Sequence, residues 1–271
     1  MENTQTIDLC RLCKIRPTKE DSHILPKFVG KKAKKVWRGR LVALTGQRRI
    51  VQDTEKLPFL CEICEDIFGD LLESPFARDW FHLYPNIPVD QAPVDKTVRF
   101  YISVAWRVLR FLMDKNAIPE QSLEDAQVTE LFFRDYLNNE DAPLPPWNNY
   151  LFYASDFDGV SGAPPSDLMR YSAGFGMVLF VDREFIIDLP IRPAIISIIG
   201  PFIHVLELQP SEAIVNTKPE EWEGFRLVSG RVRSPRRAPP HQLTRWLTRI
   251  LCTPREDFVD DVISTTWHLT E

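Results

Sequence analysis

Two Cys-x-x-Cys pairs limit what the first third of this chain can fold into. The pairs are Cys10/Cys13 and Cys61/Cys64, and they contain four of the five cysteines of the 271-residue chain. Two residues between paired cysteines form a tight turn that points both thiolates at one tetrahedral ion, and two such turns complete a four-sulfur site. The sequence therefore predicts one structural Zn²⁺, against the alternatives of disulfides and of a chance spacing.

The expected surroundings of the chain agree with metal-binding thiols. Its first residues lack the apolar run of a secretory signal peptide, so we expect a reducing, cytoplasmic location in which thiols persist as ligands. No apolar run reaches about 18 residues without polar breaks, so we expect no membrane span. At 44% apolar residues, the chain has enough apolar side chains for a substantial core.

A histidine and a helical segment extend the cysteine pattern into a longer motif. The first pair is followed by Ser22-His23-Ile24-Leu25-Pro26, and the second pair, in Leu60-Cys61-Glu62-Ile63-Cys64, leads into a segment predicted to be helical over residues 65–73. A strand histidine, a hairpin and a helix, arranged around two cysteine pairs, resemble the HNH, or His-Me finger, nucleases. The resemblance covers about 75 residues and implies a treble-clef, HNH-like zinc finger.

The resemblance also implies roles for individual residues. In that family the strand histidine is the general base that activates water, and a single divalent ion stabilises the phosphorane-like transition state. By resemblance, His23 is the general base, and Glu65 is an oxygen ligand for a catalytic Mg²⁺ or Mn²⁺, assisted by Asp21 or Asp53. The implied function is metal-dependent hydrolysis of phosphodiester bonds by an endonuclease, in a setting of bacterial phage defence.

The chain departs from the family pattern where the chemistry would occur. Ser22 stands where the family usually has a metal-binding Asp, Glu or His, and no Asn lies between His23 and Cys61. His23 is then interpreted as a core histidine of the finger, and Glu65 as a carboxylate favoured by a helix N-terminus. Two alternatives to a nuclease follow. One is a catalytically silent zinc finger that binds nucleic acid, and the other is an adaptor subunit of a larger complex.

Basic residues are concentrated in one segment of the finger. The whole chain has a formal net charge of -5, whereas residues 24–51 contain nine Lys or Arg and no Asp or Glu. On the hairpin of the finger they would contact a phosphate backbone, since each neutralised phosphate adds affinity through counterion release. A solvated sheet edge is the alternative interpretation. The expected partner is DNA, bound by Lys27, Lys31, Lys32, Lys34, Lys35, Arg38, Arg40, Arg48 and Arg49.

The remainder of the chain is predicted to be a second domain. Three prolines in residues 83–93 mark a boundary between a finger over 1–82 and an α+β domain over 94–271, through which a protein partner would bind. Apolar residues at helical spacing predict helices over 96–115 and 122–138. Ser122 is the expected N-cap of the second helix, and Arg107 and Arg110 are expected on the flank of the first.

The predicted fold class is completed by a β region. β-Branched and aromatic runs predict strands over residues 149–156, 176–181, 185–188, 194–199, 202–208 and 225–232, with a loop over 157–169. Gly, Pro and Asp between these runs favour antiparallel connections. The sequence thus predicts an α+β protein in which an N-terminal zinc-bound, treble-clef HNH-like finger is followed by a helical pair and a mainly antiparallel β region.

Overall fold

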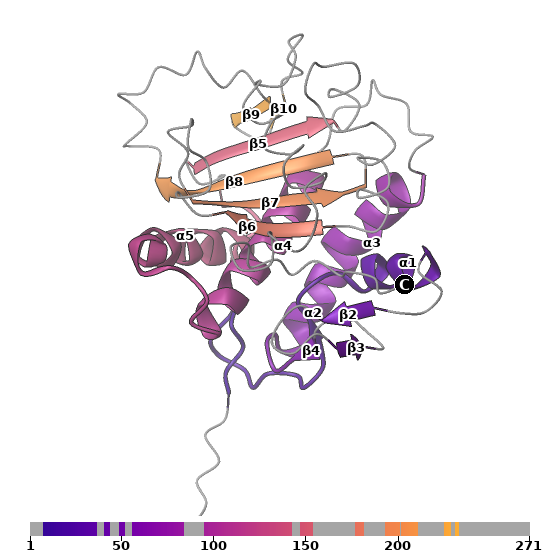
Figure 1. The fold of residues 1–271 in the computed structure, drawn as a ribbon, viewed down its shortest axis with the longest axis horizontal. Helices are drawn as coiled ribbons and strands as arrows, with labels where there is room; N and C mark the ends of the chain where they lie inside the picture. Colours follow the sequence, from indigo (N-terminus) through magenta and orange to yellow (C-terminus); the bar gives the residue numbers. More distant parts are fainter. Residues whose placement is uncertain are drawn as a thin grey trace, which may run out of the picture.

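The protein is an α+β structure in which a small N-terminal unit packs beside a helix-covered sheet (Figure 1). This fold was obtained as a computed structural model. The structure describes residues 8–36, 41–43, 49–51, 56–83, 95–142, 147–153, 177–181, 193–200, 202–210, 225–228 and 231–232. None of the helices within these ranges combines the length and apolarity that crossing a bilayer requires.

Before Cys61, the described residues of the N-terminal unit form one short helix and two small antiparallel sheets. Strand β1 (Ser22–His23) pairs with β4 (Lys56–Leu57), which places His23 opposite Lys56. Between them lie helix α1 (Lys27–Val36) and the hairpin of β2 (Leu41–Ala43) and β3 (Arg49–Val51). The strand that carries His23 and a following hairpin are therefore both present, as the sequence predicted.

The second cysteine pair opens a long helical run. Cys61 has an extended backbone at the N-cap, and α2 (Glu62–Phe68) begins at the next residue. The run continues through η1 (Gly69–Glu73), α3 (Ser74–Phe76) and η2 (Ala77–Phe81), of which η1 and η2 are π-helical. Pro75 has no N–H for a helical bond, and the two π-helical segments flank it. The helix predicted over residues 65–73 is confirmed and is longer than expected.

Two helices follow, at the places where apolar periodicity predicts them. Helix α4 (Asp95–Asp114) ends before Asn116, whose left-handed φ of 52° is typical of a residue that terminates a helix. Helix α5 (Glu120–Asn138) begins after Pro119, which occupies the N-cap position. The prediction of Ser122 as the N-cap is wrong, because Ser122 lies buried inside the first turn and its N–H donates to the Pro119 carbonyl at 2.9 Å.

The β region forms one antiparallel sheet, as predicted, with the strand order β10-β9-β5-β8-β7-β6. Residues predicted as one strand over 225–232 form two paired strands instead, β9 and β10. The predicted strand over 185–188 and the predicted loop over 157–169 lie outside the described residues. The strands are β5 (Trp147–Tyr153), β6 (Met177–Val181), β7 (Ala194–Ile199), β8 (Phe202–Pro210), β9 (Phe225–Val228) and β10 (Arg231–Val232).

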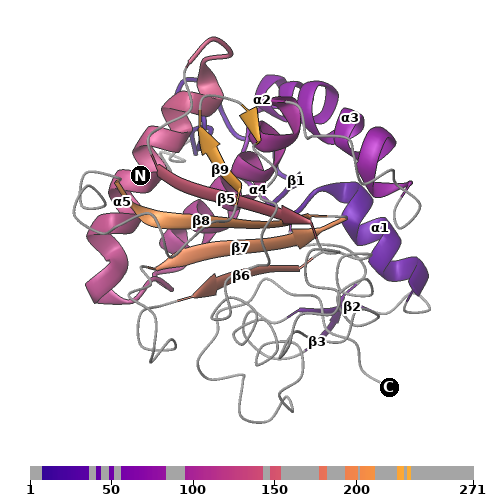
Figure 2. The ribbon, with the colours of Figure 1, turned by 90° about the horizontal axis from the view of Figure 1, so that it is seen from above.

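Helix α4 lies between the sheet and the N-terminal unit (Figures 1 and 2). It is apolar on nearly every side, as expected of a helix buried all round. On the sheet side, the Tyr101 hydroxyl donates to the carbonyl of Ile199. On the other side, the Phe100 ring stacks on Phe76 at 3.9 Å between centroids, and Trp106 contacts Phe59 at 5.7 Å.

The hydrophobic core is therefore continuous across the predicted domain boundary. Buried residues of the N-terminal unit, of α4 and of the sheet belong to one cluster. Trp80, near the end of the helical run, contacts Phe202 of β8 directly, with ring centroids 5.2 Å apart. The division into residues 1–82 and 94–271 stays a prediction, and the described parts on its two sides bury apolar surface against each other.

Candidate metal centre and nucleic-acid surface

The four cysteines of the two pairs converge on one point. All four are free thiols, and their Sγ atoms lie within 4.8 Å of one another. The Sγ atoms of Cys13 and Cys61 are 3.9 Å apart, and sulfurs at about 2.3 Å from a tetrahedral Zn²⁺ would be about 3.8 Å apart. Cys10, Cys61 and Cys64 are buried, and Cys13 is partly exposed. The donor set and its spacing fit a metal ion such as zinc.

The first cysteine pair is held by a turn whose backbone shape is fixed locally. The Lys14 N–H donates to the Cys10 carbonyl at 3.0 Å, and Lys14 adopts a left-handed φ of 58°. The Cys10 N–H donates to the Arg16 carbonyl at 2.8 Å, and Leu9 bridges to Pro17. The turn brings the backbone back on itself, so that both thiols project to the same side.

Backbone hydrogen bonds place the first pair beside the second. The Arg11 N–H donates to the Phe59 carbonyl at 2.8 Å, and the Lys19 N–H donates to the Leu60 carbonyl at 2.7 Å. Both acceptors directly precede Cys61, from which α2 begins, and the Glu65 N–H closes the first turn on the Cys61 carbonyl at 3.0 Å. Two segments 48 residues apart in sequence thus meet at the sulfur cluster.

The sulfur cluster favours one thiolate even among the free thiols. The pKa of Cys10 is lowered, first because the Cys64 thiol donates to its sulfur. Burial acts in the opposite direction, and backbone N–H groups of Cys61, Cys13 and Leu12 that point at the sulfur lower the pKa further. The pKa of Cys64 is raised, because its proton is held by Cys10 and its sulfur is buried. Backbone N–H donors around a thiolate are the environment that a metal-bound sulfur requires.

Ser22 and Glu65 meet directly beside the sulfur cluster. The Ser22 hydroxyl donates to Glu65 Oε2 and accepts the Leu60 N–H at 3.2 Å. Ser22 is fully buried, whereas Glu65 is half-buried at the start of α2. The two positions at which the resemblance implies metal ligands are therefore adjacent, and a hydroxyl–carboxylate hydrogen bond joins them.

His23 is held by its backbone as well as by its place in the strand. Its side chain is 8% exposed, and its carbonyl accepts a hydrogen bond from Nη1 of Arg107 at 3.3 Å. Consecutive strand residues project to opposite faces of a sheet, so the Ser22 contact with Glu65 directs the His23 side chain the other way. The structure pairs Glu65 with Ser22 and gives His23 a mostly buried setting.

The carboxylates suggested as helpers of Glu65 are not seen beside it among the described residues. Asp21, one suggested helper, is exposed and lies 3.8 Å from the Lys19 ammonium, and Asp53, the other, lies outside the described residues. Within the ranges that the structure describes, the only group of three or more His, Cys or acidic side chains close enough to hold an ion is the four-cysteine cluster.

Arg107 is a site residue that the sequence analysis misplaced. It was expected on the flank of its helix, yet its side chain is 1% exposed. Its Nη1 lies 2.8 Å from Glu73 Oε1 as well as near the His23 carbonyl, and its guanidinium faces the Phe68 ring at 5.5 Å. An arginine among apolar residues such as Val104 and Val108 was the only sequence signal, and its partner lies 34 positions earlier.

Five of the nine predicted nucleic-acid residues lie on a helix and not on the predicted hairpin. Lysine is a good helix former, and Phe28 anchors α1 by its contact with Phe81 at 4.8 Å. Lys27, Lys31 and Lys32 are exposed, and Lys34 and Lys35 belong to the same helix. Arg49 lies in β3, whereas Arg38, Arg40 and Arg48 lie outside the described residues.

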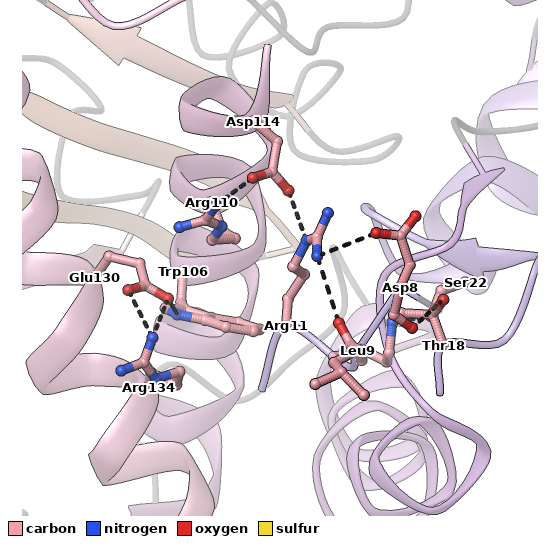
Figure 3. Close-up of polar contacts among 11 residues, drawn as sticks. Asp8, Leu9, Arg11, Thr18, Ser22, Trp106, Arg110, Asp114, Glu130 and Arg134 are labelled. Carbon is pink, nitrogen blue, oxygen red and sulfur yellow. Dashed lines mark hydrogen bonds and ion pairs between the residues drawn. The ribbon is translucent and has the colours of Figure 1, made fainter. Parts of the chain in front are cut away.

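The first cysteine pair is also fastened to α4 and α5. Arg11, between the two cysteines, has its Nε 2.9 Å from Asp114 Oδ2, and Asp114 also accepts a hydrogen bond from Arg110 (Figure 3). Asn138 donates to the Leu12 carbonyl at 2.9 Å. Within the helical pair itself, Nε1 of Trp106 in α4 donates to Glu130 in α5 at 3.3 Å. The four-cysteine cluster is therefore built against the helical pair.

The fold and the site define an α+β protein with a four-cysteine centre at the junction of its N-terminal unit and its helices. Comparisons with known protein families, with curated proteins and with solved structures find no match for this chain. Its function is therefore argued from its own residues.

Proposed function

We propose that the chain is a zinc-stabilised, HNH-like finger protein that binds nucleic acid, DNA in the first instance, through the lysines of α1. The observation that carries this proposal is the exposure of Lys27, Lys31 and Lys32 on one short helix. No acidic residue lies within residues 24–51 to neutralise them. A patch of this kind attracts a phosphate backbone without reading its sequence.

The zinc ion would have a structural role in this protein. Four thiolates close its coordination sphere and leave no position for water or substrate. The ion would fix the start of α2, and α1 packs through Phe28 against the same helical run, so the lysines would be presented at a constant position. Such a finger binds through its surface and needs no reaction at the metal.

The surroundings of Ser22 and Glu65 support binding without cleavage. The Ser22 hydroxyl donates to Oε2 of Glu65, so one oxygen of this carboxylate is already engaged. His23, the candidate general base, is only 8% exposed, whereas a general base must come within hydrogen-bond reach of the attacking water. The alternative of a catalytically silent finger is therefore the one that these contacts favour.

The binding proposal is tested by replacing lysines in matched sets. Lys27, Lys31 and Lys32 are changed together to glutamine, and affinity for a fluorescent DNA duplex, single-stranded DNA and RNA is measured by anisotropy at several salt concentrations. We expect a loss of roughly tenfold or more at low salt and a shallower salt dependence, because fewer counterions are released. The control changes Lys19, Lys96 and Lys115, which are exposed and lie outside α1, to glutamine. This control variant loses the same number of charges. If both variants lose affinity equally, net charge explains the binding and α1 is not the binding surface.

A metal-dependent endonuclease is the second candidate function. It is favoured by one observation, the contact between Ser22 and Glu65, because the resemblance places metal ligands at these two positions. In this case a divalent ion would displace the Ser22 hydroxyl from Glu65, and His23 would deprotonate water on exposure.

Cleavage assays decide between the two functions. Plasmid, single-stranded DNA and RNA are incubated with the full chain in Mg²⁺, Mn²⁺, Co²⁺ or Ni²⁺, and His23→Ala is assayed beside the wild type. A nuclease would lose about two to four orders of magnitude in rate with His23→Ala while keeping its zinc and its affinity. The silent finger predicts intact substrates under all four ions, with unchanged binding by His23→Ala.

A further inference from the structure

A row of large apolar side chains lies exposed along the helical run that follows Cys61. Ile63, Ile67 and Leu71 are 48%, 44% and 39% exposed. They recur every four residues, so they share one face of α2 and η1 over about 12 Å of helix. Isolated exposed apolar residues are ordinary, but three aligned ones form a continuous strip of the kind that binds a partner.

The exposed row borders the core on one side. Cys64, Phe68 and Leu72 each follow a member of the exposed row by one residue, and all three are buried. The apolar face of the helix is therefore wider than the part that the core covers. The uncovered part lies at the edge of the core, where a second helix could pack against it.

Carboxylates border the exposed row on its other side. Glu62, Asp66 and Asp70 each precede a member of the row by one residue, and all three are exposed. From residue 62 to residue 77 the chain contains five acidic residues and no Lys or Arg. The face thus combines an apolar strip with an acidic border whose own segment of the chain supplies no Lys or Arg.

We propose that this face of α2 and η1 binds a basic amphipathic helix of a partner protein. Apolar side chains of the partner at i, i+4 and i+8 would cover Ile63, Ile67 and Leu71, and its Lys or Arg residues would lie against the acidic border. The acidic border repels the phosphates of nucleic acid, so this surface is distinct from α1. It also disfavours a symmetric pairing with a second copy, which would set carboxylates against carboxylates.

A designed peptide tests the proposal on the full-length, zinc-loaded chain. The probe is a 16-residue helix of leucine, lysine and alanine, with leucines at i, i+4 and i+8 and lysines beside them, and binding is followed by calorimetry. Ile63→Ser with Ile67→Ser should weaken binding at least about tenfold, because apolar burial is lost. Asp66→Asn with Asp70→Asn should weaken it less and reduce its salt dependence. All four positions are exposed, so circular dichroism should show an unchanged fold.

Matched controls distinguish binding at this face from nonspecific binding of the peptide. Leu131→Ser removes an equally exposed residue (45%) from α5 and should leave peptide binding unchanged. A peptide of the same composition in scrambled order, and one with glutamate in place of lysine, should not bind. Equal binding by the wild type and the Ile63/Ile67 variant, or by the ordered and scrambled peptides, overturns the proposal. So does a dimer of the wild-type chain in sedimentation that Ile67→Ser dissociates, since a second copy would then be the occupant.

Discussion

Arg107 of α4 and Glu73 of η1 form an ion pair, with 2.8 Å between Nη1 and Oε1. The arginine is almost fully buried, and the glutamate is 17% exposed. The same Nη1 lies 3.3 Å from the His23 carbonyl, so one guanidinium joins α4, the helical run and β1. The strand that carries His23 is thus positioned by a residue that lies 84 positions later in the chain.

The Arg107–Glu73 pair should be strongly coupled in stability. Arg107→Met leaves Glu73 without its cation and removes one donor to the His23 carbonyl, and we expect a loss of about 3 kcal/mol or more in the free energy of unfolding. Glu73→Leu leaves a buried cation and should also destabilise. The double variant should lose less than the sum of the two, which urea unfolding of all four proteins measures as a double-mutant cycle. Additive losses would show that the two side chains act independently.

Removal of the metal should affect the whole core. We expect about one zinc per chain by elemental analysis and its loss in Cys61→Ala. Because Arg11 and Asn138 fasten the first cysteine pair to α4 and α5, loss of zinc should abolish cooperative unfolding and the near-ultraviolet signal of aromatic residues such as Trp106. Cys252→Ala, outside both pairs, should keep the metal. A zinc-free protein with intact tertiary signals would contradict this coupling.

Ser22 should contribute to stability through its two hydrogen bonds. Ser22→Ala leaves the buried Leu60 N–H and one Glu65 oxygen without their partner, and we expect a cost of about 1–3 kcal/mol in urea unfolding. Thr18→Ala removes an exposed hydrogen bond to the Asp8 carbonyl and should cost less. Zinc content should be unchanged in both variants. Similar small costs for the two changes would mean that the Ser22 contacts are weak.

Burial of His204 should make the folded state sensitive to acid. Desolvation lowers the pKa of His204 from 6.5 to about 3, so the unfolded chain binds a proton that the folded chain excludes. Stability from this residue is full above pH 6.5 and falls as the pH decreases toward 3, by about 2 kcal/mol at pH 5.

A substitution isolates this contribution from acid release of the metal. His204→Gln lacks the titrating group, so the difference in unfolding free energy between wild type and variant should shift in favour of the variant between pH 7.5 and pH 5. Metal release acts on both proteins and cancels in this difference. His82→Gln, at an exposed position, is the control and should parallel the wild type. A constant difference across this range would contradict the assignment to His204.

Features that depend on local geometry can be predicted from the amino-acid sequence. The spacing of Cys10 and Cys13 specifies a turn, and the structure closes it by the Lys14 N–H on the Cys10 carbonyl. Apolar spacing predicted α4 and α5, and runs of β-branched residues predicted β7 and β8, because each pattern reflects which face an element buries. The convergence of the two cysteine pairs followed from the tetrahedral site that they would complete.

Features that depend on residues far apart in the chain follow from tertiary packing and could not be predicted. The lysine-rich segment was predicted as a hairpin, but it forms the helix α1, in which Phe28 packs against Phe76 and Phe81. These two partners lie far along the chain and are not evident from the local sequence. Arg107 could enter the core only because Glu73 and the His23 carbonyl meet it there. An unpaired buried charge is costly, so a prediction from sequence places arginine at the surface. Whether the cost of burying the guanidinium is compensated depends on which distant groups lie next to it in the folded chain.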